Sequence, residues 1–347
     1  MRNDRQRPTM QDVADKVGVS KALVSLVFRN APGPSAQTRE RIFAAAAELG
    51  YRVNRTAALM TARRSHLIGV MANIRSSFHA ELVEDIVAAA DRAGYEVVLG
   101  AVTPTHGEPR VIETLRDFRC EGMLLIGPEL PGPSLATLGE QLPTVVVGRR
   151  ISARSLDVVR SADARGIAAA VDHLVGLGHR CLVHVAGGAG VIATDRRNGF
   201  LRAMRRNGLA ESAQVIDGDF TETAGMAAAK EMLATTLPTA VVCTNDYVAV
   251  GVLDVLRRAG VDVPGQVSVT GYDDSTLARL GNIDLTSVSQ QPRDQADRAV
   301  EAVVQRLDGG RTEPVSAVLP PALVVRATTA PPPSDRKALP QNVSDIV

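Results

Sequence analysis

The sequence predicts an α/β protein with a small all-helical head, and three observations support this prediction. Over residues 66–327, apolar segments of strand length alternate with longer segments of helical periodicity. Residues 9–50 contain short helical patterns instead. The charge divides at the same place: residues 1–65 carry 12 Lys and Arg against 5 Asp and Glu, and the remainder carries 27 against 33. We therefore expect a basic head joined to an acidic body, a distribution suited to binding phosphates.

The head begins with two short helical patterns on either side of Gly18. Thr9, followed three residues later by Asp12, predicts a capping box, and Gly18 fits the left-handed residue that ends a helix. Ser20 is then a good N-cap for the second helix. Two helices joined by a short turn containing Gly are typical of a helix-turn-helix, whose second helix enters the major groove of DNA. A plain helical hairpin inside a larger core is the alternative.

The second helix has two faces that predict different roles. The residues expected to face inward are Leu23, Val24 and Val27. Those expected on or near the outer side are Lys21, Ala22, Ser25 and Leu26. Residues 35–50 predict a third helix that would hold the first two in place.

Composition narrows the class of protein. A length of 347 residues predicts two or three domains. The charged N-terminus, MRNDRQRP, does not have the pattern of a secretory signal, and no apolar run reaches the length of a membrane span. Three widely spaced cysteines fit neither a disulfide framework nor a metal site. We expect a cytoplasmic protein with no metal and no cofactor, and a disordered Pro-rich tail over residues 328–347.

The body is expected to form two α/β lobes with parallel sheets, because it has too many strands for one small sheet. The predicted strands are residues 67–71, 96–101, 122–126, 144–147, 181–185, 240–243 and 266–271. The predicted helices are residues 80–93, 109–118, 165–177, 196–207, 221–233 and 247–259. In such sheets ligands bind at the carboxyl ends of the strands.

Two patterns that would point to an enzyme or a metalloprotein are weak. The stretch GGAGVIA, residues 187–193, has the glycine spacing of a dinucleotide-binding loop, but TDRR follows it in place of an apolar helix start. His173, His179 and His184 are close in sequence but are divided between a helix end and a strand, which favours structural roles. The sequence shows no recognisable arrangement of catalytic residues, so a nicotinamide enzyme is disfavoured.

The order and spacing of five motifs resemble the lactose/galactose repressor family over about residues 8–327. The motifs are TMQDVADKVGVSKALVS, TRERIFAAAAELGYRVN, HLVGLGHR, PTAVVCTNDYVAVG and VPGQVSVTGYDD. The resemblance implies a homodimeric transcription regulator, most often a repressor, whose affinity for a palindromic operator in double-stranded DNA depends on a small ligand. It also implies a DNA-binding head (1–52), a hinge helix (53–65) and an effector domain shaped like a periplasmic binding protein (66–327).

The resemblance assigns residues to both sites. The DNA-binding residues that it implies are Thr9, Ser20, Lys21, Ala22, Ser25, Leu26, Asn54, Arg55, Ala57 and Met60. Leu26 stands where the family commonly has Arg, so a contact with a thymine methyl group or core packing are both open there. Met60 stands where leucine usually wedges between base pairs.

The resemblance implies four effector-binding residues, Arg196, Phe220, Asn245 and Asp273, and we add Phe78 because it falls in a predicted loop after the first strand. A guanidinium, an amide and a carboxylate around one cleft suit a polyhydroxylated ligand, most simply a sugar. Two other functions use similar lobes. A transport-type sugar-binding protein would have no use for residues 1–60, and an α/β enzyme would need catalytic groups that the sequence does not display.

Overall fold

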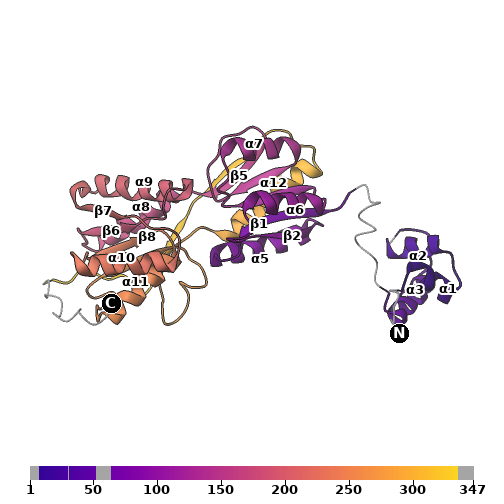
Figure 1. Ribbon diagram of the computed structural model, residues 1–347, viewed down its shortest axis with the longest axis horizontal. Coiled ribbons are helices and arrows are strands. Elements are labelled where there is room, and N and C mark those ends of the chain that lie inside the picture. Colours follow the sequence, from indigo (N-terminus) through magenta and orange to yellow (C-terminus); the bar gives the residue numbers. More distant parts are fainter. Residues whose placement is uncertain (1–7, 30, 52–63, 335–347) are drawn as a thin grey trace. The chain divides into compact units, whose positions relative to one another are not determined.

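The computed structural model describes residues 8–29, 31–51 and 64–334, and these form two compact units that divide between Ser65 and His66 (Figure 1). The first unit contains the three helices expected for the head. Their bounds are α1 (Met10–Val17), α2 (Lys21–Phe28) and α3 (Ala36–Leu49). The apolar faces of all three helices meet in one core, so no helix of the head depends on its own propensity alone.

The capping residues of the head are those that the sequence predicts. The Thr9 hydroxyl accepts a hydrogen bond from the Asp12 amide, and the Asp12 carboxylate accepts from the Thr9 amide in return. Gly18 ends α1 in the left-handed conformation, with φ 73°. The Ser20 hydroxyl caps α2 by accepting from the Leu23 amide at 3.2 Å.

The second unit consists of two lobes, each built on a six-stranded sheet. The N-lobe sheet is parallel, with the order β11-β5-β4-β3-β1-β2. Its strands are β1 (Leu67–Asn73), β2 (Glu96–Val102), β3 (Gly122–Ile126), β4 (Thr144–Val147), β5 (Leu156–Ser161) and β11 (Ser316–Leu319). Its helices are α5 (Ser77–Arg92), α6 (Glu108–Asp117), α7 (Gly132–Gln141) and α12 (Pro292–Leu307).

The C-lobe sheet has the order β12-β10-β9-β8-β6-β7, and only β12 runs antiparallel to its neighbour. Its strands are β6 (Leu182–Val185), β7 (Ala213–Ile216), β8 (Ala240–Cys243), β9 (Ser268–Asp273), β10 (Thr286–Ser289) and β12 (Ala322–Val324). Its helices are α8 (Asp163–Gly176), α9 (Val191–Arg206), α10 (Glu222–Ala234) and α11 (Asp246–Arg258). One core lies under α8 and α9 and another under α10 and α11, so the sheet is covered on both faces (Figure 1).

The chain passes between the lobes three times, after β5, after β10 and after β11. As a result α12 follows C-lobe strands in sequence but packs in the N-lobe, where it lies against α5. The three connections join the same pair of lobes, which is the arrangement expected for a two-lobed binding domain. Among the residues that the structure describes, no helix has the length and apolar character needed to cross a membrane.

The sequence misplaced the start of the tail. Thr328 is buried, and its hydroxyl donates to the Val269 carbonyl at 2.7 Å. The Ala330 carbonyl accepts from Ser268, and it also lies 2.9 Å from Nε2 of His179. The start of the expected tail is therefore held against the C-lobe through Thr328 and Ala330. Residues 335–347 lie outside the described residues.

Candidate functional site

The guanidinium of Arg196 is the centre of a buried polar cluster in the C-lobe. Arg196 is 4% exposed and projects from α9. Its Nε donates to Asp163 at 2.9 Å, and its Nη1 donates to the Thr244 carbonyl at 2.6 Å. The ring of Tyr272 lies 3.8 Å below the guanidinium carbon. These contacts fix the guanidinium plane, and no described residue accepts a hydrogen bond from Nη2.

Asp273 lies beside this guanidinium at the end of β9. Its Oδ1 is 3.7 Å from Nη1 of Arg196 and accepts a hydrogen bond from Nε2 of Gln290 at 2.7 Å. Its backbone has φ 112°, outside the ordinary range of an L-residue, so the fold holds this residue in a strained conformation. Asp163 is the nearer carboxylate to this guanidinium, with its Oδ1 2.9 Å from Nε of Arg196.

Burial shifts the pKa values of the carboxylates in this cluster. It raises the pKa of Asp273 to about 8, while the positive charge of Arg196 opposes the rise. It raises the pKa of Asp246 to about 6, although Ser287 and Ser275 donate hydrogen bonds to that carboxylate. Burial also raises the pKa of Asp163, against the opposing charge of Arg196. The cluster therefore holds more carboxyl groups than positive charges, and burial favours their protonated forms.

Asn245 is positioned as the N-cap of α11. Its Oδ1 accepts from the Val248 amide at 2.9 Å, and its Nδ2 donates to the Phe220 carbonyl at 3.0 Å. The Phe220 ring is half-buried, and its centroid lies 6.0 Å from the guanidinium carbon of Arg196. The structure thus brings Arg196, Phe220, Asn245 and Asp273 together, as the sequence predicts, while half of the hydrogen-bonding capacity of Asn245 serves the fold.

Phe78 does not join this cluster. The sequence places it in a loop after the first strand, but it lies in the first turn of α5 with 6% exposure, and it packs in the N-lobe core with Leu82 and Ile86. The prediction was wrong about the environment of Phe78 because α5 begins at Ser77, three residues before the predicted start. No sequence pattern indicated that Asp163 belongs to the site, whereas Tyr272 lies in the VPGQVSVTGYDD motif directly before Asp273.

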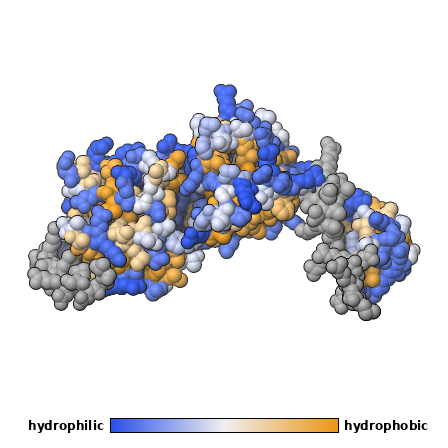
Figure 2. Space-filling view, viewed as in Figure 1, coloured by the Kyte–Doolittle hydropathy of each residue, from blue (hydrophilic) through white to orange (hydrophobic). Residues whose placement is uncertain are grey.

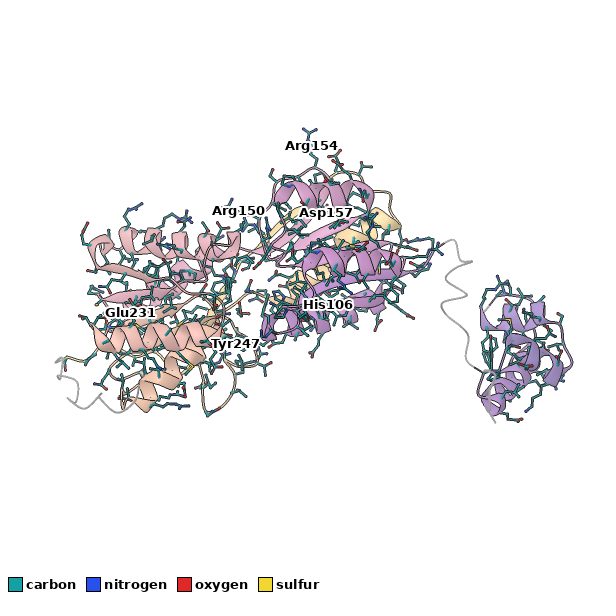
Figure 3. The ribbon with its side chains drawn as sticks, in the orientation of Figure 1. His106, Arg150, Arg154, Asp157, Glu231 and Tyr247 are labelled. Carbon is teal, nitrogen blue, oxygen red and sulfur yellow. The ribbon has the colours of Figure 1, made fainter. Side chains whose placement is uncertain are left out.

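Two polar contacts join the lobes next to this cluster. Glu81 of α5 accepts hydrogen bonds from the Thr276 hydroxyl at 2.7 Å and from Nη2 of Arg279 at 2.6 Å. Arg150, which follows β4, donates its Nε to both carboxylate oxygens of Asp195 on α9 at 2.9 Å. Figure 3 shows Arg150 at the boundary between the lobes. Each contact pairs one side chain of the N-lobe with residues of the C-lobe, so both contacts depend on the relative orientation of the two lobes.

Helix α2 of the head exposes two of the residues predicted to contact DNA. Lys21 and Ala22 are exposed in its first turn, and Ser25 is half-buried one turn further. Val24 and Val27 are buried, as predicted, whereas Leu23 is only partly buried. The hydroxyl of Thr9 takes part in the capping box. The hydroxyl of Ser20 accepts a hydrogen bond in its cap, so its hydrogen is not used there and can be donated to another group.

Leu26 is partly buried on α2, so the structure leaves both of its predicted roles open. The remaining predicted DNA contacts, which belong to the hinge, lie outside the described residues: Asn54, Arg55, Ala57 and Met60.

The glycine-rich loop at residues 187–190 has the strand-loop-helix context of a dinucleotide-binding motif. The loop follows β6, and α9 begins directly after it at Val191, so the predicted helix start at Arg196 was too late and the TDRR residues lie inside the helix. A Cβ on Gly187 would lie 2.6 Å from the Phe220 ring, and one on Gly188 would lie 3.1 Å from the Gly218 carbonyl. These glycines therefore let the loop pack against its own lobe.

The histidines have separate structural partners, as the sequence predicts. His173 lies 3.0 Å from the Thr329 hydroxyl, and Nδ1 of His184 lies 2.8 Å from the Val242 carbonyl. Within residues 8–29, 31–51 and 64–334, no group of His, Cys, Asp and Glu has the arrangement of a metal site.

Comparison with known proteins agrees with this architecture. Residues 9–54 match the bacterial regulatory proteins of the lacI family, and residues 171–329 match a periplasmic binding protein-like domain. The HTH-type transcriptional regulator CelR of Thermobifida fusca is 30% identical over 93% of this chain and 98% of that protein. A solved complex of CelR with cellobiose superposes with a TM-score of 0.68 at 30% identity, covering 93% of this chain and 100% of that one.

Two further solved structures are similar. A LacI transcriptional regulator from a Rhodococcus species is 44% identical, with a TM-score of 0.74 over 76% of this chain and 98% of that one. The lac repressor dimer, bound to operator and the anti-inducer ONPF, is 27% identical, with a TM-score of 0.79 over 94% of this chain and 100% of that one.

A helix-turn-helix head and a two-lobed binding domain with a buried polar cluster define a ligand-controlled DNA-binding regulator. The chain belongs to the lacI family of bacterial regulatory proteins. It is a transcription regulator and not an enzyme, and the dinucleotide-like spacing of its glycine loop has a packing explanation.

Proposed function

We propose that this regulator binds a small polyhydroxylated ligand at the Arg196 cluster and that the ligand changes its affinity for operator DNA. The observation that carries the proposal is a pair of polar groups that lie side by side and keep unused hydrogen-bonding capacity. Nη2 of Arg196 and Oδ2 of Asp273 have no hydrogen-bond partner among the described residues, and the two groups are only 3.7 Å apart at their nearest atoms. Neighbouring hydroxyl groups of a sugar each donate and accept, so they match such a pair.

The aromatic groups support a sugar as the ligand class. Tyr272 fixes the guanidinium from one side, and the half-buried Phe220 ring offers an apolar face at the same site. Small-molecule sites commonly combine apolar walls with a few placed polar groups. The solved complex of the relative CelR with cellobiose is consistent with this class.

For DNA, we propose that Lys21 and Ala22 contact base edges from the first turn of α2 and that Ser25 adds a contact one turn further. Their exposure and their place at the start of the helix support this role. Thr9 and Ser20 lie at helix N-termini, where backbone amides favour phosphate groups. Leu26 and the hinge residues Asn54, Arg55, Ala57 and Met60 complete the proposed contact surface.

We propose that the active form is a cytoplasmic homodimer on a palindromic operator, acting most simply as a repressor. Apolar residues gather on the surface of the N-lobe over β2 and α6, where Leu99 is 49% exposed and Phe118 is 56% exposed (Figure 2). Exposed apolar surface of this kind favours association. A two-fold dimer would place two reading helices on two half-sites.

Operator binding measured with and without cellobiose, galactose and other sugars tests the proposal. We expect a sugar to change the operator affinity of the wild-type chain, and we expect Asp273→Asn to keep operator affinity while reducing that response. Allosteric coupling of about 1–3 kcal/mol corresponds to a change of roughly 5- to 150-fold. A full response in Asp273→Asn would contradict the assignment of the site, and a wild-type chain that no sugar affects would contradict the ligand class.

A further inference from the structure

A strained turn joins the proposed ligand site to a contact between the lobes. Asp273 and Asp274 follow each other where β9 ends, with φ 112° and φ 51°. Residues other than glycine rarely adopt such values, and they persist only where the surrounding structure holds them. At one end of the turn Asp273 lies 3.7 Å from Arg196. At the other end the Thr276 hydroxyl donates to Glu81 of the N-lobe at 2.7 Å.

The carboxylate of Asp246 holds this turn in place. Asp246 is the first residue of α11 and is 1% exposed. Its Oδ2 accepts hydrogen bonds from the backbone amide and from the hydroxyl of Ser275, both at 2.8 Å. Its Oδ1 accepts from the Ser287 hydroxyl at 2.6 Å, and that hydroxyl accepts from the Asp274 amide at 3.0 Å. Asp246 therefore binds the turn directly at Ser275 and, through Ser287, at Asp274.

The fold reserves space for this carboxylate and keeps it apart from both ends of the turn. A Cβ on Gly271 of β9 would lie 2.3 Å from Oδ1 of Asp246, so any larger residue there would displace the carboxylate. Asp246 makes no hydrogen bond with Arg196 or with Glu81, and within the described part of the chain it has no hydrogen-bond partner in common with Glu81. Its influence on the contact with Glu81 therefore passes through the turn.

We propose that Asp246 is a positioning residue for the response to the ligand. It holds the strained turn that places Asp273 at the proposed ligand site. The same turn places Thr276 and Arg279 at the contact with Glu81 of α5. Because the turn is fixed as one unit, a ligand bound at Asp273 changes how strongly the other end of the turn contacts the N-lobe. This inference rests on the function proposed above and names the part of the fold that links ligand binding to the arrangement of the lobes.

A double-mutant cycle in the full-length chain tests this role without a ligand. Substitutions at positions that share no partner normally have additive effects on the free energy of unfolding. We expect Glu81→Ala to lower that free energy in the wild-type chain, and to lower it by only about half as much in Asp246→Ala, where the turn no longer presents Thr276 to Glu81. Asp246→Asn keeps an acceptor oxygen for Ser275 and should retain most of the wild-type effect. Equal effects of Glu81→Ala in all three backgrounds, measured by urea unfolding, would overturn the proposal.

Two serines complete the design of the cycle. Ser287→Ala removes only the hydroxyl that joins Asp246 to Asp274, and it takes the place of Asp246→Ala if that variant does not fold. The matched control is Ser268→Ala, because Ser268 is also a buried serine of the C-lobe sheet but its hydroxyl bonds to Ala330 and not to the turn. Glu81→Ala should have its full effect in Ser268→Ala. A reduced effect there as well would overturn the proposal, because loss of stability alone would then explain the result.

Operator binding at saturating cellobiose, galactose or ribose measures the consequence for the control of DNA binding. For a sugar that changes the operator affinity of the wild-type chain, we expect Ser287→Ala to reduce that change by about 3-fold or more, and an unchanged response would overturn the proposal. If none of the three sugars affects the wild-type chain, the ligand class proposed above fails. The double-mutant cycle still decides the role of Asp246, because it needs no ligand.

Discussion

Replacing Asp163 tests whether a buried ion pair holds the Arg196 guanidinium in place. Asp163 is 3% exposed at its side chain and lies 2.9 Å from Nε of Arg196, which is 4% exposed. Removing one partner of such a pair leaves an uncompensated buried charge, which typically costs about 3–5 kcal/mol. Asp273 lies 3.7 Å from the same guanidinium, but burial raises its pKa to about 8, so at neutral pH it compensates little of that charge and we expect a loss within this range for Asp163→Ala.

The substitution Asp163→Asn isolates the charge, because asparagine keeps the shape and one acceptor oxygen. A hydrogen bond to a charged group contributes about 1.5–3 kcal/mol, and we expect a loss of that size in the free energy of unfolding. The assay is urea unfolding of the full-length chain, where a loss of stability lowers the midpoint without changing the slope.

The chain offers a matched control on the same two helices. Asp172 of α8 lies 2.6 Å from Nη2 of Arg206 of α9, but the two side chains are 48% and 57% exposed. Exposed pairs contribute about 0–1 kcal/mol, so Asp172→Asn should change stability little. Equal losses for Asp163→Asn and Asp172→Asn would refute the reasoning, because burial would then have no influence on the strength of the pair.

Four further outcomes are expected. Gly251→Ala should destabilise the chain by about 1–3 kcal/mol in urea unfolding, because a Cβ would lie 2.1 Å from the Glu222 carbonyl, whereas Gly176→Ala meets nothing within 4 Å and should not. The pKa of Asp273 is raised from 3.8 to about 8, so its contribution to stability is lost as pH rises through that window; the melting temperature should fall between about pH 5 and pH 8, and less in Asp273→Asn. Exchanging Lys21 and Ala22 should change the preferred operator in a binding-site selection by about 1–3 kcal/mol for each altered base contact, and an unchanged preference would exclude α2 as the reading helix. Glu81→Gln should weaken the contact with Arg279 and alter sugar affinity in calorimetry while operator affinity without sugar changes less; an unaltered sugar affinity would show that this contact does not bias the lobes.

The sequence predicted the regular parts of the fold because their signals are local. The capping box at Thr9 and the left-handed Gly18 each depend on residues within one helical turn. The strands β1, β3 and β8 are continuous apolar runs buried on both faces, so they stand out without knowledge of their neighbours.

The missed elements depend on partners distant in the chain. Strand β5 contains Asp157 and Arg160, which interrupt the apolar pattern expected of a buried strand. Asp157 is fully buried because Arg306 and Arg311 bring two guanidinium groups to it from about 150 residues away. Helix α7 contains glycine and proline, and the edge strands β11 and β12 are short and partly exposed, so local propensity gave no clear signal.

The residues of the site divide in the same way, into those that the local sequence predicts and those that depend on distant partners. Asn245 and Asp273 lie in two of the quoted motifs, Arg196 and Phe220 were assigned by the resemblance, and the structure brings the four together. Asp163 could not be assigned because its role comes from the packing of α8 on α9, where Gly199 lets α9 approach the Ala164 backbone so closely that a Cβ would lie 2.7 Å away.

The two lobes contribute unequally to the site, and this inequality bears on how a ligand could control DNA binding. The C-lobe supplies a guanidinium fixed by Asp163, Thr244 and Tyr272, so its contacts exist whether or not the N-lobe is close. Contacts that are the same in two states of a protein raise affinity but do not shift the equilibrium between the states. A shift requires contacts that form in one lobe arrangement only, and the described polar contacts of this kind are those of Glu81 with Thr276 and Arg279 and of Arg150 with Asp195. Loss of a C-lobe contact should therefore weaken ligand binding in both states and reduce the response at a fixed ligand concentration, whereas loss of the Glu81 contact should change the equilibrium between the states, and with it the response of the operator complex at saturating ligand.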